Sequence, residues 1–353
     1  MQKQIQEVCG SIKPIDEYWI SAAQAKQLTL TKPPGSLGVL EEVGNRLASI
    51  LETIAFGPLS KRIYVVAADH GVSREGVSAY PSEVTAQMVH NFIRGGAAIN
   101  VLARHCGIEL KIVDAGVTFD FPEESDLIRE KIVRGTSDII DGPALTRDQA
   151  EQSILVGIKL SKKAKEDGIK LLGIGDMGIG NTTSASAITA VLTGLPIATV
   201  TGRGTGVDDT RLAHKIEVIE RAIEVNRPNQ SDPTDVLSKV GGAEIGVMAG
   251  IVLGASAERI PIMSDGFIAT AAAALAIALS PIVRDYLFLA HQSQEPGHVA
   301  LINHLNLKPL LSLDMRLGEG TGAALAMHIV EAAAKILSEM ATFDSAGITN
   351  MQP

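Results

Sequence analysis

The sequence predicts an α/β protein whose mostly parallel sheet is covered by helices on both faces. Two observations predict this fold class. Short aliphatic runs alternate with alanine-rich stretches of helical length, which is typical of βαβ units. The aliphatic runs are almost continuously apolar, as expected for strands buried on both faces. A chain of 353 residues is long enough for one large domain of this kind with an appendage.

Seven runs are predicted to be strands, giving a sheet of about six or seven strands. In chain order they cover residues 62–69, 109–116, 170–176, 197–201, 259–265, 285–291 and 308–314. Alanine-rich stretches such as 243–257 and 269–279 predict helices between them. The longest apolar run, residues 267–283, is shorter than the ~20 residues of a membrane-spanning helix. We interpret it as a buried helix and expect no membrane span.

The two ends of the chain have a different pattern. Residues 2–54 indicate helices and loops, interrupted by a Pro-Pro-Gly sequence at 33–35 that must break any helix. Residues 323–340 predict one amphipathic helix. We therefore assign residues 60–320 to a large α/β domain. Residues 1–59 and 321–353 are expected to form a small helical domain together.

The composition excludes some classes of partner and site. A net charge of −9 argues against a broad nucleic-acid surface, and an aromatic content of 3% leaves few stacking platforms for bases. Any anionic ligand should therefore be small and bound locally. The two cysteines, Cys9 and Cys106, lack CxxC spacing and predict neither a disulfide framework nor a cysteine-rich metal site. With no apolar signal segment in the first 19 residues, we expect a cytoplasmic protein.

Nearly every predicted strand ends in a polar, glycine-rich turn. In open parallel sheets ligands bind beyond the carboxyl ends of the strands, so these turns predict one extended site. The alternative is that polar residues and glycine simply collect in loops.

Residues 173–178 contain the spacing G-x-G-x-x-G after one of the predicted strands. A dinucleotide site also needs an acidic residue ~20 positions on, at the end of the next strand. The next predicted strand, 197–201, is instead followed by Gly-Arg-Gly-Thr-Gly. The motif is therefore weak evidence for a dinucleotide or for a nicotinamide-dependent oxidoreductase.

The same glycines remain good evidence for a phosphate site. Gly178 and Gly180 would let backbone N–H groups approach an anion, and Asn181 and Thr182 supply donors where a helix begins. A second loop, residues 202–206, contains Gly204, and Lys215 in the following helix could add a positive charge. No P-loop lysine follows, so NTP hydrolysis is not indicated. Tight strand-to-helix turns are the alternative explanation of both loops.

Two carboxylates are candidate catalytic groups. Glu319 lies between two glycines, which would let the backbone bend and hold the acid against a ligand. Among apolar neighbours its pKa should rise, as suits a general base; the alternative is an acid placed at a helix N-terminus. Asp176 is the second candidate, with a capping or turn role as its alternative. Asp69 and His70 lack companion ligands, so no metal is expected.

Several ordered motifs resemble one enzyme family. They are KPPGSLG, AADHGVS, SAYPSEVTAQMV, GGAAINVLAR, DAGV, GDMGIGNTT, GRGTG, SDGF and LDMRLGEGTGAALAM, and they run from residue 32 to residue 327. This set resembles the nicotinate-nucleotide–dimethylbenzimidazole phosphoribosyltransferases, which act in assembling the lower nucleotide loop of cobalamin. The resemblance covers nearly the whole chain.

The resemblance implies a Rossmann-like, doubly wound sheet in a homodimer that needs no cofactor. It implies that nicotinate mononucleotide and 5,6-dimethylbenzimidazole give α-ribazole 5′-phosphate and nicotinate. Glu319 matches the family's catalytic base, while Asp176 stands where well-known members have glutamate, which leaves its catalytic role open. Asp176 or Asp265 could stabilise positive charge on the ribose. Other positions match the phosphate region (Gly178, Gly204, Lys215) or the base pocket (Ser78, Tyr80, Gln87, Met177, Leu317).

Two other function classes stay open from the residues alone. An oxidoreductase would bind a nicotinamide dinucleotide tightly, and a non-catalytic nucleotide sensor would use the same phosphate loops without turnover. Benzimidazole, phenolic and purine acceptors all remain possible for a transferase.

Overall fold

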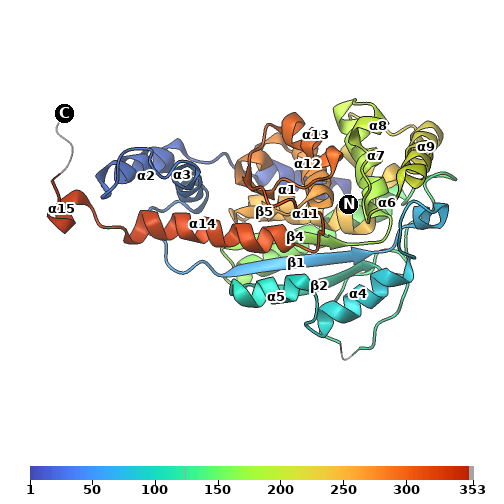
Figure 1. Cartoon of the computed structure of the whole chain (residues 1–353), viewed down its shortest axis with the longest axis horizontal. Helices are drawn as coiled ribbons and strands as arrows, with labels where there is room; N and C mark the ends of the chain where they lie inside the picture. The colour runs from blue at the N-terminus through green and yellow to red at the C-terminus, as the bar shows by residue number, and fades with distance from the viewer. Residues whose placement is uncertain (124, 350–353) are drawn as a thin grey trace.

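The computed structural model describes residues 1–123 and 125–349 and contains one seven-stranded sheet (Figure 1). Every strand pair is parallel, and the order is β3-β2-β1-β4-β5-β6-β7. The α/β prediction is therefore confirmed. The strands are β1 (Lys61–Ala68), β2 (Glu109–Gly116), β3 (Ile128–Arg129), β4 (Leu171–Met177), β5 (Ile262–Ser264), β6 (Leu287–His291) and β7 (Pro309–Leu311).

The helices fill the connections between the strands. They are α1 (Gln2–Ser11), α2 (Glu17–Thr29), α3 (Val39–Leu51), α4 (Glu83–Ile93), α5 (Ala98–His105), α6 (Arg147–Glu166), α7 (Asn181–Thr193), α8 (Ile197–Val200), α9 (Asp209–Asn226), α10 (Pro233–Val240), α11 (Ala243–Ala257), α12 (Phe267–Leu279), α13 (Pro296–Leu305), α14 (Thr321–Glu339) and α15 (Phe343–Ala346). Two 3-10 turns, η1 (Gly71–Glu75) and η2 (Pro281–Tyr286), complete the set.

The strand order changes direction at β1, which pairs with β2 on one side and β4 on the other. In a doubly wound sheet the loops diverge at this switch point and leave a crevice at the carboxyl ends of the strands. The register places Val66 of β1 opposite Asp176 of β4, and Ala67 opposite Met177. The glycine-rich turn after β4 therefore begins at the crevice.

One predicted strand is wrong and one strand was missed. Of residues 197–201, the first four form the short helix α8, which packs against α7 and α13 and pairs with no strand. Its helical turn follows Pro196 and is closed by a hydrogen bond from Thr201 Oγ1 to the carbonyl of Ile197. The missed strand, β3, consists of two residues only, which is too short for an apolar pattern to reveal.

Helices cover both faces of the sheet. α11 and α12 lie on one face and α14 with α5 on the other, with α6 packed outside α11 (Figure 1). The apolar run predicted to be a buried helix forms α12 and the first part of η2, and the first ten residues of α12 are all buried. Within the described residues, no helix has both the length and the apolar character that crossing a bilayer requires.

The helices α6 and α11 approach so closely that their backbones are in contact where they cross. A Cβ atom at Gly157 would lie 2.0 Å from the carbonyl oxygen of Val247, and one at Gly250 would lie 2.0 Å from that of Ile154. Both helices therefore need glycine at the point where they cross.

Residues from both ends of the chain meet beyond one end of the sheet. α2 and α3 pack beside the second half of α14, where Ala23, Ala48 and Leu337 form a small buried cluster (Figure 1). An antiparallel bridge joins Leu30 to Thr342. By contrast α1 packs against α6 and α11, and the first half of α14 covers the sheet. The division into two domains at residues 59/60 and 320/321 stays a prediction.

The packing of α6 on α11 predicts that Gly250→Ala is destabilising. The added methyl group meets a backbone carbonyl that cannot rotate away, so the free energy of unfolding should fall by about 1–3 kcal/mol. Urea unfolding measures this. Gly10→Ala in α1 is the matched control, because no atom lies within 4 Å of its new Cβ. Equal stability of the two variants would contradict the close crossing.

Candidate active site

A cavity of about 660 Å³ opens at the carboxyl ends of the strands beside β4. Its walls come from the start of α4, the β4–α7 turn, the loop at 204–205, the start of α12, the segment after β6 and the segment before α14. Nine residues singled out from the sequence lie in these walls: Tyr80, Asp176, Met177, Gly178, Asn181, Thr182, Gly204, Leu317 and Glu319. The structure therefore brings together side chains that are up to 239 positions apart in the sequence.

Glu319 is held in a left-handed backbone conformation. Its φ is 63°, and both flanking glycines, Gly318 and Gly320, have φ of 85°. This conformation is unfavourable for a residue with a side chain by about 1–2 kcal/mol, so the surrounding contacts must impose it. The backbone N–H of Glu319 donates to the carbonyl oxygen of Asp176 at 3.3 Å.

The Glu319 side chain is buried, and among the described residues one of its two carboxylate oxygens has no hydrogen-bond partner. Burial raises its pKa, against a smaller opposing effect of a backbone hydrogen bond near Ile99. Among the described residues no donor lies within hydrogen-bonding distance of its Oε2 atom. A buried carboxylate with a raised pKa and a free oxygen is suited to accept a proton from a ligand.

Gly175 makes this position of Glu319 possible. A Cβ atom at Gly175 would lie 2.2 Å from the nitrogen of Gly320 and 2.5 Å from the carbonyl carbon of Glu319. Gly173 likewise faces α14, near Met327. The first two glycines of the G-x-G-x-x-G spacing thus lie inside β4, where Gly173 accommodates α14 and Gly175 accommodates the turn before it, and only Gly178 belongs to the turn after β4.

Asp265 lies behind the wall of the cavity rather than in it. Its carboxylate accepts hydrogen bonds from the N–H groups of Gly320 at 3.0 Å and Ala323 at 2.8 Å, at the start of α14. Burial raises its pKa to about 7, with the charge of Glu319 adding to the rise and the backbone bonds opposing it. These hydrogen bonds hold the segment that carries Glu319 in place. The sequence analysis had instead suggested that Asp265 contacts the ribose or the phosphate.

Asp176 lies beside Glu319 with its side chain directed at the same segment. Its Oδ2 accepts a hydrogen bond from Asn181 Nδ2 at 2.8 Å. Burial raises its pKa to about 7, and the negative charge of Asp265 contributes further. The carboxyl group can therefore carry a proton near neutral pH.

Lys215 and the two glycine-rich turns form a compact polar cradle. The side chain of Lys215 is fully buried, and its Nζ donates to Thr182 Oγ1 at 2.8 Å and to the carbonyl of Gly202 at 3.3 Å. A Cβ atom at Gly204 would lie 2.7 Å from Thr182 Oγ1 and 3.3 Å from Lys215 Nζ. Burial lowers the pKa of Lys215 to about 8, and the negative charge of Glu295 opposes the shift. Gly180 caps the start of α7, with φ of 96°, and does not line the cavity.

Glu295 is a site residue that the sequence analysis did not single out. It lies after β6, lines the cavity, and its Oε1 accepts the N–H of Gly204 at 2.9 Å. In the sequence, only the polar stretch after the strand predicted at residues 285–291 pointed to this region. Arg316, Phe267, His291 and Ser293 also line the cavity and were also missed as site residues.

The predicted base pocket is only partly assembled around the cavity. Tyr80, Met177 and Leu317 line it, and Val84 and Met88 of α4 add apolar surface. Ser78 lies next to this wall, with its Oγ 3.1 Å from Thr205 Oγ1. Gln87 is exposed on α4 and does not line the cavity.

His70 belongs to the packing beneath the site. Its Nε2 lies 2.6 Å from Glu244 Oε1 and its Nδ1 lies 3.1 Å from Ser184 Oγ, all fully buried. Asp69 Oδ2 accepts hydrogen bonds from Thr118 instead. Within the part of the chain that is described, no three His, Cys, Asp or Glu side chains cluster as metal ligands would.

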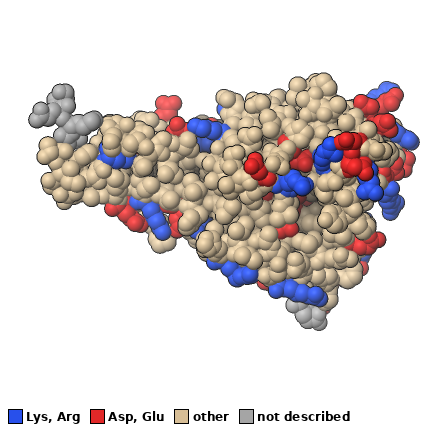
Figure 2. Space-filling model, viewed as in Figure 1, with Lys and Arg blue, Asp and Glu red and all other residues tan. Residues whose placement is uncertain are grey.

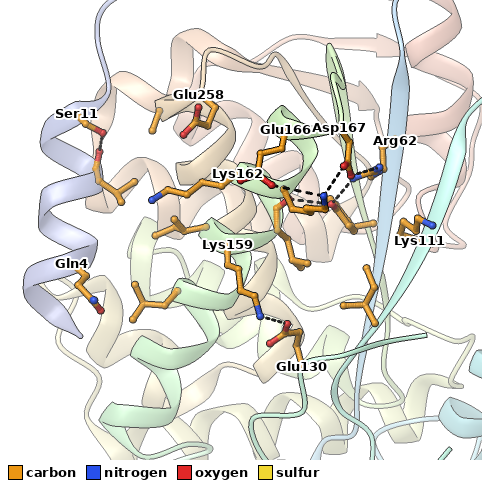
Figure 3. A pocket seen from close by; sticks show the side chains of 18 of the residues that line it. Gln4, Ser11, Arg62, Lys111, Glu130, Lys159, Lys162, Glu166, Asp167 and Glu258 are labelled. Carbon is orange, nitrogen blue, oxygen red and sulfur yellow. Dashed lines mark hydrogen bonds and ion pairs between the residues drawn. The ribbon is translucent and has the colours of Figure 1, made fainter. Parts of the chain in front are cut away.

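A larger cavity of about 1350 Å³ lies at the opposite ends of the strands, beside α1 and α6 (Figure 3). Most of its charged side chains pair with one another. Arg62 contacts Glu109 at 2.6 Å. Arg62 also contacts Asp167 at 2.9 Å, and Lys159 contacts Glu130 at 2.6 Å (Figure 3). These pairs leave little unsatisfied charge for a ligand, so the smaller cavity is the better candidate site.

Comparisons with known proteins cover nearly the whole chain. A family model described as phosphoribosyltransferase matches residues 12–348. A nicotinate-nucleotide–dimethylbenzimidazole phosphoribosyltransferase from Geobacter sp. strain M21 is 51% identical over 98% of this chain and 99% of its own. A relative of the same name from Chloroflexus aggregans is 53% identical over 97% of each chain. The crystal structure of CobT from Thermus thermophilus matches with a TM-score of 0.91 and 46% identity, over 95% of this chain and 100% of that one.

The burial of Lys215 predicts a specific pH dependence of stability. A lysine with a pKa of about 8 when folded and 10.5 when unfolded leaves the unfolded chain with more bound protons between these pH values. Wild-type stability should therefore rise, relative to Lys215→Met, by up to about 3 kcal/mol as pH increases through this window.

Urea unfolding of both proteins across this range measures the effect. Lys162→Met, which removes an exposed lysine of α6, serves as the control. A difference between wild type and Lys215→Met that stays constant with pH would contradict the lowered pKa.

Proposed function

This chain belongs to the nicotinate-nucleotide–dimethylbenzimidazole phosphoribosyltransferase family, and we propose that it transfers the phosphoribosyl group of nicotinate mononucleotide to 5,6-dimethylbenzimidazole. The products are α-ribazole 5′-phosphate, used for the lower ligand of cobalamin, and nicotinate. One observation carries the proposal: a single cavity joins the unsatisfied carboxylate of Glu319 to the polar cradle around Lys215.

The chemistry needs a base but no acid. The ring nitrogen of nicotinate is cationic in the mononucleotide and becomes neutral when nicotinate leaves, so no proton need be supplied. The benzimidazole attacks through one ring nitrogen, and its other ring N–H becomes acidic as the new bond forms. We assign this proton to Glu319, whose raised pKa makes it an effective acceptor.

The remaining polar groups are assigned to the ribosyl phosphate. Lys215, Thr182 and the amides of the two glycine-rich turns hold the 5′-phosphate, and this binding energy positions the anomeric carbon. Asp176, when ionised, stabilises positive charge that develops on the ribose. The reaction is a single displacement that inverts the anomeric centre from β to α.

The acceptor is assigned to the apolar side of the cavity. Met88, Met177 and Leu317 offer flexible, polarizable surface for a flat heterocycle, and Tyr80 lies at the rim. Tyr80 and Leu317 expose 55% and 57% of their surfaces there, which is consistent with the homodimer that we propose. Cys9 and Cys106 are both free thiols, as expected of a protein that functions in the reducing cytoplasm.

The surface charge agrees with small substrates. On the face shown in Figure 2, acidic and basic side chains are interspersed and no broad patch of one sign is visible. This face therefore offers no extended surface of one charge, which is consistent with recognition of a small ligand inside the cavity.

Replacing the proposed base provides the first test. Glu319→Gln should reduce turnover by ~10²–10⁴-fold because the amide cannot accept the proton, while nicotinate mononucleotide still binds. Nicotinate release, followed with and without dimethylbenzimidazole, measures turnover and separates a transferase from an oxidoreductase or a sensor. Turnover of the variant close to that of wild type would remove Glu319 from this role.

Two glycines of β4 provide a matched pair. Gly175→Ala would push the Glu319–Gly320 peptide away from the sheet. Because the base would then be misplaced relative to the substrate, kcat should fall by about 10²-fold. Gly173→Ala meets side-chain atoms of Ile63 and Met327, at 2.8 and 2.9 Å, rather than the peptide that carries Glu319, so most of the turnover of the folded variant should remain. Equal activity of the two variants would show that the backbone contact does not position the base.

A further inference from the structure

We propose that Arg316 binds the 5′-phosphate of the substrate and thereby couples phosphate binding to the placement of Glu319. The proposal rests on the proposed function and adds a second cationic ligand of the phosphate, together with a positioning role. It is carried by the location of Arg316 between the phosphate cradle and the catalytic carboxylate.

Arg316 is the only lysine or arginine among the described residues that line the cavity. Its Nη1 lies 3.4 Å from the carbonyl oxygen of Gly204, so the guanidinium is at the edge of the loop that also contacts Lys215. Within the same described set, Arg316 forms no ion pair with any carboxylate. One weak hydrogen bond leaves most of its five donors available.

The charge of the cavity calls for a second cation. A phosphate monoester carries about −1.5 to −2 charges near neutral pH, and Glu295 already occupies the N–H of Gly204. Lys215 offers at most one positive charge, which cannot by itself balance a charge near −2. A guanidinium matches phosphate oxygens with two parallel hydrogen bonds and stays charged at any relevant pH.

The segment that carries Arg316 also carries Glu319, with only Leu317 and Gly318 between them. The far end of the segment is fixed, because Asp265 binds the N–H of Gly320. Its near end is held more loosely, by a 3.3 Å hydrogen bond from the N–H of Gln294 to the carbonyl of Met315. A phosphate bound by Arg316 would tie this near end to the 202–206 loop and restrict the orientation of Glu319.

Binding energy from the phosphate would then be used at the reacting centre. A substrate without the phosphate should lose kcat as well as affinity, because the segment is no longer held. The arginine should matter only when a phosphate is present to engage it.

The experiment compares nicotinate mononucleotide with nicotinate riboside, which lacks the phosphate, in wild type, Arg316→Ala and Arg316→Lys. For Arg316→Ala we expect kcat/KM with the mononucleotide to fall by about 10²-fold, with kcat itself reduced. With the riboside the change should stay within about threefold. Arg316→Lys should lie between the two, because it keeps the charge but loses the paired hydrogen bonds.

Two further readouts separate a direct role from a structural one. Phosphite added with the riboside should activate wild type but not Arg316→Ala. Guanidinium ion should partly restore Arg316→Ala with the mononucleotide. Arg211→Ala, an exposed arginine at the start of α9 outside the cavity, is the control and should behave as wild type.

Three results would overturn the proposal. Equal losses with both substrates would indicate a purely structural role, and unchanged kinetics would indicate none. A loss confined to nicotinate mononucleotide and absent with nicotinamide mononucleotide would move Arg316 to the ring carboxylate. If wild type itself released no nicotinate with dimethylbenzimidazole, the proposed function would fail instead, so the two failures are distinguishable.

Discussion

The site depends on one close contact between a strand and a turn. β4 has no side chain at Gly175, and the peptide between Glu319 and Gly320 lies in the space that a Cβ atom would fill. Asp265 holds the other side of this peptide through the first N–H groups of α14. The acid therefore projects from a turn fixed between a sheet and a helix, which is the rigid support that a catalytic group needs. The left-handed conformation of Glu319 is tolerated because both sides are held.

The same region contains several ionisable side chains whose charged forms are destabilised by burial. Asp176, Asp265 and Glu319 all have raised pKa values, and Lys215 has a lowered one, with burial as the largest cause in each case. Such groups reduce the free energy of unfolding, and their concentration beside one cavity is typical of a site under functional constraint. The apolar packing of α11 and α12 on the sheet provides the stability that offsets them.

Much of the fold and part of the site could be predicted from the sequence, for identifiable reasons. Buried parallel strands are continuous in hydrophobicity, so six of the seven strands were found, but residues 197–201 have the same apolar character in a short helix. Polar side chains at the end of a strand or in the first turn of the helix after it, such as Asp176 and Thr182, were expected at the crevice. Glu295 and Arg316 were missed because their importance arises only from the folding of distant loops around Gly204. Asp265 was noticed, but its partners are backbone N–H groups, which carry no sequence signal.

A crystal structure with dimethylbenzimidazole and nicotinate mononucleotide bound would test the central claim most directly. The account predicts that a Glu319 carboxylate oxygen lies about 2.6–3.2 Å from a ring nitrogen of the heterocycle, with the phosphate at the 202–206 loop. A heterocycle bound with both nitrogens out of reach of Glu319 would contradict it, as would a phosphate held at the opposite ends of the strands.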